Sequence, residues 1–469
     1  MRARGAAFLA ATLALAGCDN GTANNEPSLP PPQLISGAVA LSGDCSTGAA
    51  TSGLPGEPTL AADPTNPKQL IAAWLDNRQP DRAGIIVAVT DDGGKHWDRT
   101  SLPDLLRCNG GPYVHVTDPW ISIGPDGIVY LSTLAIRPAT PAGTPRDISV
   151  SVSRDHGASW DPSVVVETAT APPASPDKEA VFADTRHPGI AYAGWADYQV
   201  TSGIEPSLDS VRFARTIDSG KTWSTPVTLY SGHDEAQDNQ LLMTAGGVLL
   251  DVFVEGSSLP GTANAPPIPV KVRVMRSKDQ GQTWSQPIDA ASFTYTTGVD
   301  PGTGKELRFS GQNIAATVSG NAVYASFFED HKDFSTILTV RSDDAGLHWR
   351  PAHIAVRERS AAFLPTLAVA GDGTLGMLWF DLRHYVASSP RLDTDVWFSS
   401  SGDRGAHWME RHAAGPFDLR SAPSTRYGPF IGDYMGLVGL PDGFGAAFVM
   451  ARPQSRNGPT DVFFTRIRG

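Results

Sequence analysis

Acidic side chains recur at matching points along this chain, where a pair of apolar strands begins or ends. The starts of the first strands carry Glu57, Asp118, Glu179, Asp238, Gln312 and Asp433. The ends of the second strands carry Asp76 and Arg78, Asp197, Glu255, Glu329 to His331, and Asp381, Arg383 and His384. Carboxylates that meet in one pocket are suited to general acid–base catalysis, and a concave place where such groups converge is the natural candidate site.

The elements that position these residues are short strands separated by dense turn signals. The first unit reads as strands at 58–63, 70–74 and 85–89, and the second opens at Asp118 with Asp126-Gly127 in its hairpin. Similar units open near Glu179, Asn239, Gln312 and Leu364, and a last one runs from Tyr434 to Thr465. Alternation of this kind predicts an all-β chain built from repeated antiparallel units.

A short turn motif, Ser/Thr-x-Asp-x-Gly-x-x-Trp, occurs six times in register. Its Asp members are Asp92, Asp155, Asp218, Asp279, Asp344 and Asp403, so the copies lie 59 to 65 residues apart. The Asp and Ser/Thr side chains can accept bonds from turn amides, and the Gly supplies a backbone conformation that other residues resist. The Trp ring then buries apolar area, which predicts a structural role for the motif and a repeat architecture for the fold.

This motif resembles the Asp-box, or BNR, repeats of the sialidase superfamily, from about Glu57 to Arg468. The resemblance implies a β-propeller of four-stranded antiparallel blades, with the boxes on outer turns away from the active face. Seven first strands predict seven blades, with the six of sialidases as the alternative. The chain ends one strand short at Gly469, so we expect 34–41 to supply the missing outer strand and close the ring.

The same resemblance also implies which residues form the site, although some residues of the sialidase site have no counterpart in this chain. It implies Asp81 as acid/base and Tyr434 as nucleophile. The Glu that should serve as the partner of Tyr434 has no clear counterpart; the fourth unit offers Glu235 or Glu255, and we take Glu235 as the candidate. The resemblance also implies sugar contacts at one mouth of the channel from Arg78, Asp76, Asp118, Asp197, Asp381, Arg383 and Arg426. Where sialidases place a carboxylate-binding Arg, this chain has Glu57-Pro58, and the other binding Arg has no clear counterpart.

Three functions therefore stay open. The first is an exo-α-sialidase type of glycoside hydrolase acting on terminal sugars. The second is a non-catalytic propeller that binds a glycan or a protein through the same mouth. The third is a hydrolase or lyase of another sugar class that uses paired acids such as Asp76, Asp118 and Asp381. We expect no cofactor, although an acid-rich mouth would suit Ca²⁺ or Mg²⁺.

The N-terminus has the composition of an export signal. Residues 1–18 combine Arg2 and Arg4 with an apolar stretch, and 15–18 (LAGC) resemble a bacterial lipobox, so we expect Cys18 to carry lipid. Residues 19–33 are rich in Asn, Pro and Ser and predict a flexible tether, followed by the propeller at 34–469. These features predict an exported lipoprotein, periplasmic or on the cell surface, held to a membrane through its anchor alone.

Charge and cysteine content narrow the partners. A net charge of −12 argues against nucleic acid and leaves a glycan as the expected ligand of what we take to be a monomer. Two cysteines besides Cys18 remain, Cys45 and Cys108, and in an oxidising compartment they predict a disulfide.

Overall fold

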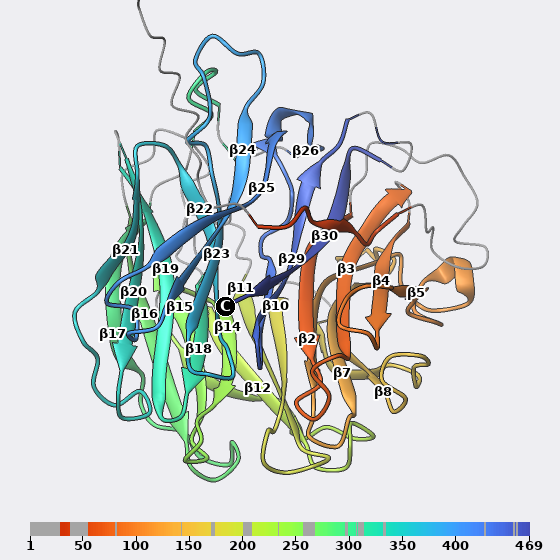
Figure 1. Cartoon of the computed structure of the whole chain (residues 1–469). Coiled ribbons are helices and arrows are strands. Elements are labelled where there is room, and N and C mark those ends of the chain that lie inside the picture. The colour runs from red at the N-terminus through yellow and green to blue at the C-terminus, as the bar shows by residue number, and fades with distance from the viewer. Residues whose placement is uncertain are drawn as a thin grey trace, which may run out of the picture.

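The computed structural model is built almost entirely of antiparallel strands arranged around a central axis (Figure 1). It describes residues 29–37, 55–79, 82–141, 143–169, 174–199, 209–232, 234–256, 268–295, 299–305, 307, 314–331, 334–425, 428–453, 455 and 458–469. Within these ranges the helical segments are two single turns, η2 (Arg107–Asn109) and η3 (Leu419–Ser421). The predicted all-β class is confirmed.

The strands follow one another in runs of four hydrogen-bonded neighbours. The first runs are β2 (Pro55–Ala62), β3 (Leu70–Gln79), β4 (Arg82–Thr90), β5 (Asp98–Ser101); β6 (His115–Ile123), β7 (Val129–Ile136), β8 (Arg146–Ser153), β9 (Val164–Ala169); and β10 (Ala174–Ala183), β11 (Ala191–Gln199), β12 (Ser210–Thr216), β13 (Val227–Ser231). The next are β14 (Glu235–Met243), β15 (Leu249–Gly256), β16 (Ile268–Ser277), β17 (Ile288–Tyr295); β18 (Ala315–Ser319), β19 (Ala322–Asp330), β20 (Ser335–Ser342), β21 (His353–Glu358); and β22 (Ala362–Val369), β23 (Leu375–Asp381), β24 (Asp393–Ser401), β25 (Met409–Asp418). A single parallel bridge from Ala83 to His115 links the first two runs into one sheet.

The last sheet joins the two ends of the chain. It contains β28 (Gly436–Leu440), β29 (Gly443–Ala451), β30 (Thr460–Arg468) and, as its outer member, β1 (Gln33–Leu34). Gln33 pairs with Phe464 and Leu34 with Phe463, and the amide of Ile35 extends the ladder to Val462. The expected pairing of the N-terminal strand is therefore present, one residue earlier than predicted, while residues 38–41 lie outside the described residues.

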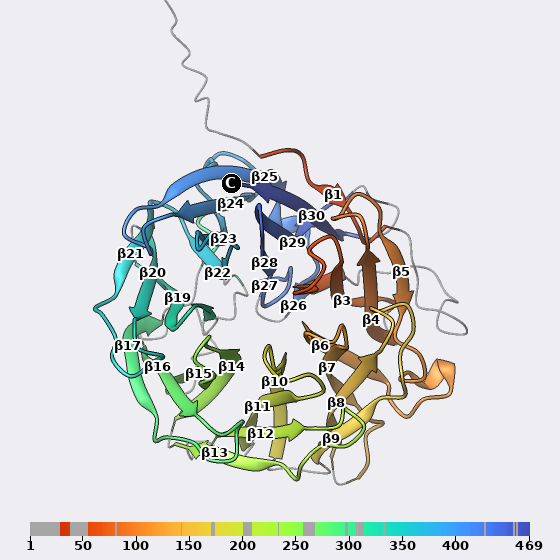
Figure 2. The ribbon, with the colours of Figure 1, turned by 60° about the horizontal axis from the view of Figure 1, so that its bottom comes forward.

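Figure 2 shows the sheets arranged as a ring, with β6, β10, β14, β22 and β28 on the side toward its centre. Second strands pack directly behind these inner strands, and an aromatic ring recurs at one position along them. Trp74, Trp195, Phe253, Phe327 and Trp379 are fully buried there. Large aromatic rings at this depth fill the space between neighbouring sheets, which explains why the radial core holds together without helices.

The six Asp-box turns share one hydrogen-bond pattern. In the third copy the Thr216 hydroxyl donates to Asp218 Oδ1 at 2.8 Å and accepts from the amide of Gly220 at 3.0 Å. Asp218 Oδ1 also accepts from the amide of Thr222 at 2.9 Å. A Cβ on Gly220, whose φ is +77, would lie 2.6 Å from Val152 of the preceding sheet. The motif therefore folds a tight turn and fits it against the neighbouring sheet, as its structural interpretation predicted.

The box tryptophans lie closer to the surface than expected. All six are half-buried and pack against the edges of the apolar core instead of within it. Trp97 meets Phe464, and Trp284 meets Phe213, each edge-on from the next sheet along the ring. The indole sits on the outer turn, so one of its faces stays in contact with solvent.

The N-terminal boundary also differs from the sequence prediction. The amide of Leu29 donates to the carbonyl of His412 at 2.8 Å, and the Gln33 side chain donates to the carbonyl of Lys95. The segment expected to be tether up to residue 33 therefore already contacts the ring from Leu29 onward.

Candidate functional site at the channel mouth

Several inner strands begin with the same backbone irregularity. Each of β2, β6, β10, β14 and β22 has a register shift near its start, as in a β-bulge. The residue in each shift has a positive φ: Glu57 (55), Asp118 (51), Lys178 (54), Asp238 (59) and Leu364 (53). A β-bulge changes the direction in which a side chain points, and a strained non-glycine backbone persists only where the surrounding structure holds it. Because the bulge lies at the same point of each of these strands, these five positions form one layer around the channel.

Lys178 and Asp433 pair with each other across this layer. Lys178 Nζ lies 2.7 Å from Asp433 Oδ2, and the two side chains are 17% and 4% exposed. Lys178 comes from β10, and Asp433 directly precedes β28 on the opposite side of the ring (Figure 2). Burial would lower the pKa of Lys178, yet Asp433, Asp118, Asp238 and Asp177 together raise it well above its usual value. The ammonium is therefore charged at neutral pH.

Glu57 is a buried acid beside this pair. It is 2% exposed, and burial, followed by the charges of Asp118 and Asp433, raises its pKa well above the usual range. Its carboxyl hydrogen-bonds to Asp118, and the Thr117 hydroxyl lies 3.5 Å from Glu57 Oε2. Two carboxyl groups in contact favour one shared proton, so this arrangement favours the protonated form of Glu57.

The remaining acids of the layer also titrate high. Burial raises the pKa of Asp238 to about 7 and that of Asp177 to about 6, and burial with the Asp118 charge raises the pKa of Glu179 well above its usual value. Arg146 approaches Asp177 at 3.7 Å from the rim. The layer thus combines carboxyl groups whose pKa values are raised with an acid, Asp433, whose charge Lys178 compensates.

Tyr434 lines the channel cavity, and among the described residues its hydroxyl bonds to a backbone carbonyl and not to a carboxylate. Its hydroxyl donates to the carbonyl of Pro119 at 2.9 Å, and its ring meets Trp120 edge-on at 5.4 Å. Burial and then the charges of Glu57, Asp118, Glu179 and Asp433 raise the pKa of Tyr434 well above 10.0. The phenol is neutral and directed at a backbone carbonyl in this arrangement.

A cavity of about 430 Å³ occupies the channel. Apolar side chains from β2, β6, β10, β14, β18, β22 and β28 line most of it. At the mouth its walls are Asp118, Lys178, Glu179, Asp238 and Tyr434. Among the described residues that line this cavity, Lys178 is the one cation, and arginine does not contribute.

Other predicted mouth residues lie beside this layer. Asp76 is buried at the end of β3, opposite Pro55. Asp197 Oδ1 accepts from the amide of Ser175 at 2.9 Å, and burial raises its pKa. Glu235 begins β14 opposite Gly256, and its charge acts on Tyr198. None of these three is among the residues that line the cavity, whereas Tyr434 and Asp118 are.

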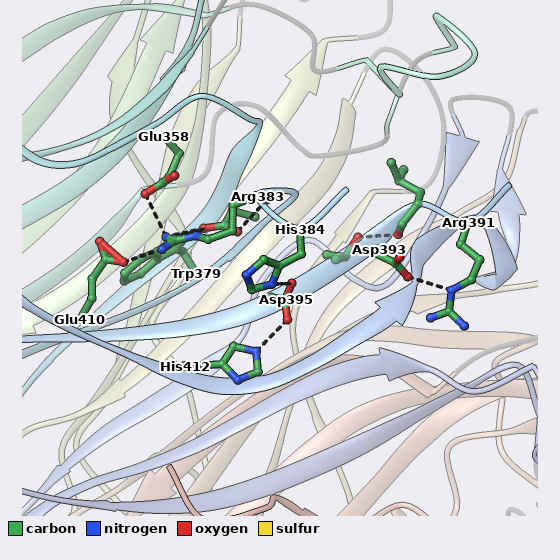
Figure 3. Close-up of polar contacts among 12 residues, drawn as sticks. Glu358, Trp379, Arg383, His384, Arg391, Asp393, Asp395, Glu410 and His412 are labelled. Carbon is green, nitrogen blue, oxygen red and sulfur yellow. Dashed lines mark hydrogen bonds and ion pairs between the residues drawn. The ribbon is translucent and has the colours of Figure 1, made fainter. Parts of the chain in front are cut away.

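Asp381 and Arg383 belong to a separate cluster at the junction of two sheets (Figure 3). Arg383 pairs with Asp381 at 2.7 Å, with Glu358 at 3.1 Å and with Glu410 at 3.0 Å. Its guanidinium lies 3.7 Å from the centre of the Trp397 ring. Arg383 is thus paired with three acids, and neither it nor Asp381 is among the residues that line the channel cavity.

Several predicted residues cannot be placed. Asp81, Arg426, Cys18 and Cys45 lie outside the described residues, and Arg78 is placed in β3 only by its backbone. Cys108 is disulfide-bonded.

Lys178 is the main residue that the sequence analysis missed. The prediction placed Glu179 at the start of its strand, whereas the position equivalent to Glu57, Asp118 and Asp238 is Lys178. Aligning the units on Asp-Pro and Asp-Asn at 118–119 and 238–239 would have set Lys178-Glu179 in the same register. The sequence therefore contained the information needed to identify Lys178, but we assigned the position to the neighbouring acid, Glu179.

Two kinds of feature are absent from the described residues. They contain no group of three or more His, Cys, Asp or Glu side chains arranged to hold a metal ion. They also contain no helix long and apolar enough to cross a membrane.

Residues 209–433 match the family of BNR repeat-like domains. This segment includes four of the six box turns, and the sheets on both sides of it repeat the same turn and strand order. This match supports the place of the chain in the sialidase/BNR superfamily. A search of curated proteins finds no sequence that matches this BNR-repeat propeller.

Solved structures with a similar course of the chain include three of different origin. A protein of unknown function from Dyadobacter fermentans DSM 18053 is 12% identical, with 93% of this chain and 98% of that chain covered and a TM-score of 0.47. Trypanosoma rangeli sialidase is 11% identical, with 93% and 59% covered and a TM-score of 0.46, so the propeller spans under two thirds of that protein. Penicillium chrysogenum α-L-arabinanase is 13% identical, with 93% and 98% covered and a TM-score of 0.45.

Proposed function

We propose that this BNR-repeat propeller is a glycoside hydrolase whose reaction takes place at the carboxylate layer of the channel mouth. The observation that carries the proposal is the division of the acids into two protonation states. Burial and the charges of Asp118 and Asp433 raise the pKa of Glu57 and favour its protonated form, whereas the ammonium of Lys178, 2.7 Å away, favours the ionised form of Asp433. Glycoside hydrolysis requires a neutral carboxyl and a carboxylate near the scissile bond, and Glu57 and Asp433 are acids of one layer beside the cavity.

In this proposal Glu57 is the general acid that protonates the leaving oxygen of the sugar. Asp433 is the carboxylate that acts on the other side of the scissile bond, as base or as nucleophile. Lys178 keeps Asp433 ionised in the buried layer, because its ammonium lies 2.7 Å away. The charge of Asp433 also raises the pKa of Glu57, which places the two acids within electrostatic reach of each other.

The exo-α-sialidase route that the resemblance implies fits these residues less well. A sialic acid carboxylate needs guanidinium partners, and the described cavity wall offers several carboxyls and one paired lysine. Tyr434 would need a base to become a nucleophile, and its hydroxyl donates to Pro119 instead. The substrate proposed here is therefore a sugar without a carboxylate.

The test is a panel of fluorogenic glycosides, neutral sugars and sialosides included, with the purified full-length protein. We expect hydrolysis of a neutral glycoside and a loss of about a hundred-fold or more in turnover for Glu57→Gln and for Asp433→Asn. Glu410→Gln, which removes an acid paired with Arg383, serves as the matched control and should keep wild-type turnover. Sialoside hydrolysis that is abolished by Tyr434→Phe would overturn the proposal in favour of the sialidase route.

A non-catalytic sugar-binding propeller is the second candidate, and one observation favours it. The Lys178–Asp433 pair and the Tyr434–Pro119 bond both cross the mouth and occupy space that a reacting sugar would need. A glycan that binds at the mouth with no turnover of any glycoside would support this candidate over hydrolysis.

We also propose that the ring has seven blades and that β1 closes it on β30, because the strand runs repeat in that number and the last run takes its outer strand from the N-terminus. An exported lipoprotein anchored at Cys18 and acting as a monomer outside the cytoplasm is consistent with the sequence of residues 1–33. Loss of fatty-acid labelling and of membrane association in Cys18→Ser would support the anchor; unchanged labelling would contradict it.

A further inference from the structure

We propose that the channel mouth contains an ammonium-binding subsite centred on Glu179, so that the glycan it takes is an amino sugar with a free amino group. The inference rests on the proposed function for its location, and it adds the class of substrate. It goes against the sialidase resemblance, which implies an anionic sugar. Four observations on the wall of the cavity lead to it.

The first observation is an unpaired acid. Glu179 lines the cavity, is 3% exposed, and neither of its carboxyl oxygens has a hydrogen-bond partner in another of the described residues. Buried carboxyl groups are almost always hydrogen-bonded, because burying one without partners costs free energy. A ligand that brings several N–H or O–H donors on one centre would satisfy both oxygens.

The second observation concerns neighbouring acids. Asp238 and Asp118 line the same cavity, and Asp238 Oδ2 also has no hydrogen-bond partner. Asp118 is the first neighbouring charge that raises the pKa of Glu179, so the two carboxyls are electrostatically close. Acceptor oxygens from adjacent inner strands thus face one region, which suits a donor with three hydrogens such as a primary ammonium.

The third observation is the charge balance. Lys178 is the one cation among the described lining residues, and Asp433 already pairs with it at 2.7 Å. The positive charge of Lys178 is therefore already balanced by Asp433, and the described lining offers no further cation for Asp118, Glu179 and Asp238. An incoming cation would compensate these acids, whereas the carboxylate of a sialic acid would add to the repulsion.

The fourth observation separates an ammonium from a metal ion. Hard cations such as Ca²⁺ take six or more oxygen ligands, and the described residues hold no group of three or more metal-ligating side chains close enough to share an ion. Much of the remaining wall is apolar, with Trp120, Leu241 and Leu364 among its members. Apolar walls with a few charged groups suit the faces of a sugar ring that carries an amino group.

The test is isothermal titration of the full-length protein at about pH 7 with chitosan trisaccharide, its fully N-acetylated counterpart, 3′-sialyllactose, putrescine and CaCl₂. We expect the free amino sugar to bind at least about ten-fold more tightly than the acetylated one, since acetylation removes the charge. The sialylated sugar should not bind. Binding should release protons to the buffer, because an ammonium favours the ionised form of Glu179.

Two variants separate the subsite from the rest of the site. Glu179→Gln keeps the shape of the side chain and should remove the preference for the free amine while leaving the acetylated sugar bound; Asp238→Asn should weaken the preference less. Glu410→Gln, with its acid outside the channel, controls for net charge. If Glu179→Gln does not fold, loss of the preference in Asp238→Asn alone still supports the subsite.

The outcomes also distinguish this inference from the proposed function. Amine-dependent binding without hydrolysis of any glycoside would support the subsite and remove the hydrolase. Hydrolysis of neutral glycosides with equal binding of free and acetylated sugars would support the hydrolase and overturn the ammonium subsite. Putrescine binding as tightly as the sugar would overturn the amino-sugar assignment, and Ca²⁺ binding that Glu179→Gln abolishes would replace it with a cation site.

Discussion

Lys178 and Asp433 are 255 positions apart in the chain and meet at 2.7 Å across the channel. Their contact joins two opposite inner strands of the ring, and it supplies the cation among the acids that converge on the mouth. Removing one partner of a buried ion pair leaves the other charge uncompensated, which costs more than the pair itself contributes.

Lys178→Met should therefore destabilise the protein by about 3–5 kcal/mol at neutral pH, measured by urea unfolding. The loss should shrink as pH falls, since the acids around the missing ammonium then take up protons. The double variant Lys178→Met/Asp433→Asn removes the stranded charge and should recover part of the stability. A single variant as stable as the wild type at about pH 7 would contradict the buried pair.

The buried Asp251 on β15 should make stability depend on pH. Both of its oxygens accept from Asn239 Nδ2 at 3.0 Å, and burial raises its pKa from 3.8 to about 7. A raised pKa in the folded state means stability that is present below the unfolded pKa and lost as pH rises through about 7.

Asp251→Asn should consequently flatten the decline in unfolding free energy between about pH 4 and pH 7, and the variant should be the more stable protein above that window. The exposed Asp372, whose pKa its bonds to Thr374 lower, is the control. Asp372→Asn should leave the slope in this window unchanged. An identical slope in Asp251→Asn and wild type would show that Asp251 does not titrate there.

The half-buried box tryptophans should contribute less than the buried ones. Trp223 packs at the edge of a core cluster that contains Trp195, and Trp195 is fully buried. We expect Trp195→Ala to cost about 3–5 kcal/mol and Trp223→Ala roughly 2 kcal/mol, because a partly exposed ring loses less burial and leaves a smaller cavity. Thermal unfolding of both variants measures the two losses of stability. A larger loss for Trp223→Ala than for Trp195→Ala would contradict the prediction.

Closure of the last sheet should depend on Ser36. Its hydroxyl donates to Asp461 Oδ1 at 2.7 Å and accepts from the amide of Val462 at 3.0 Å, with the residue fully buried. Ser36→Ala leaves both partners without this hydroxyl and should cost about 1–3 kcal/mol. Ser388→Ala, on an exposed loop, should cost almost nothing. Equal melting temperatures for the two variants would argue against a role of this contact in closure.

Local sequence determined much of the fold. The spacing of the box turns and the alternation of apolar residues predicted an all-β repeat, because a turn such as Thr216 to Gly220 closes with hydrogen bonds among residues four apart. The late position of β28, β29 and β30 predicted a missing strand, and β1 was expected near its observed place. These features depend on neighbours in the chain, so a pattern of residues is enough to show them.

The composition of the site was decided only by the tertiary structure. Whether Arg383 faces the channel depends on Glu358 and Glu410, which lie on other strands and bind its guanidinium. The protonation of Glu57 depends on Asp118 and Asp433 from two other sheets, and the partner of Tyr434 is the carbonyl of Pro119. Charge and burial depend on distance in space, so residue types and their spacing do not fix which side chains a ring of sheets brings together.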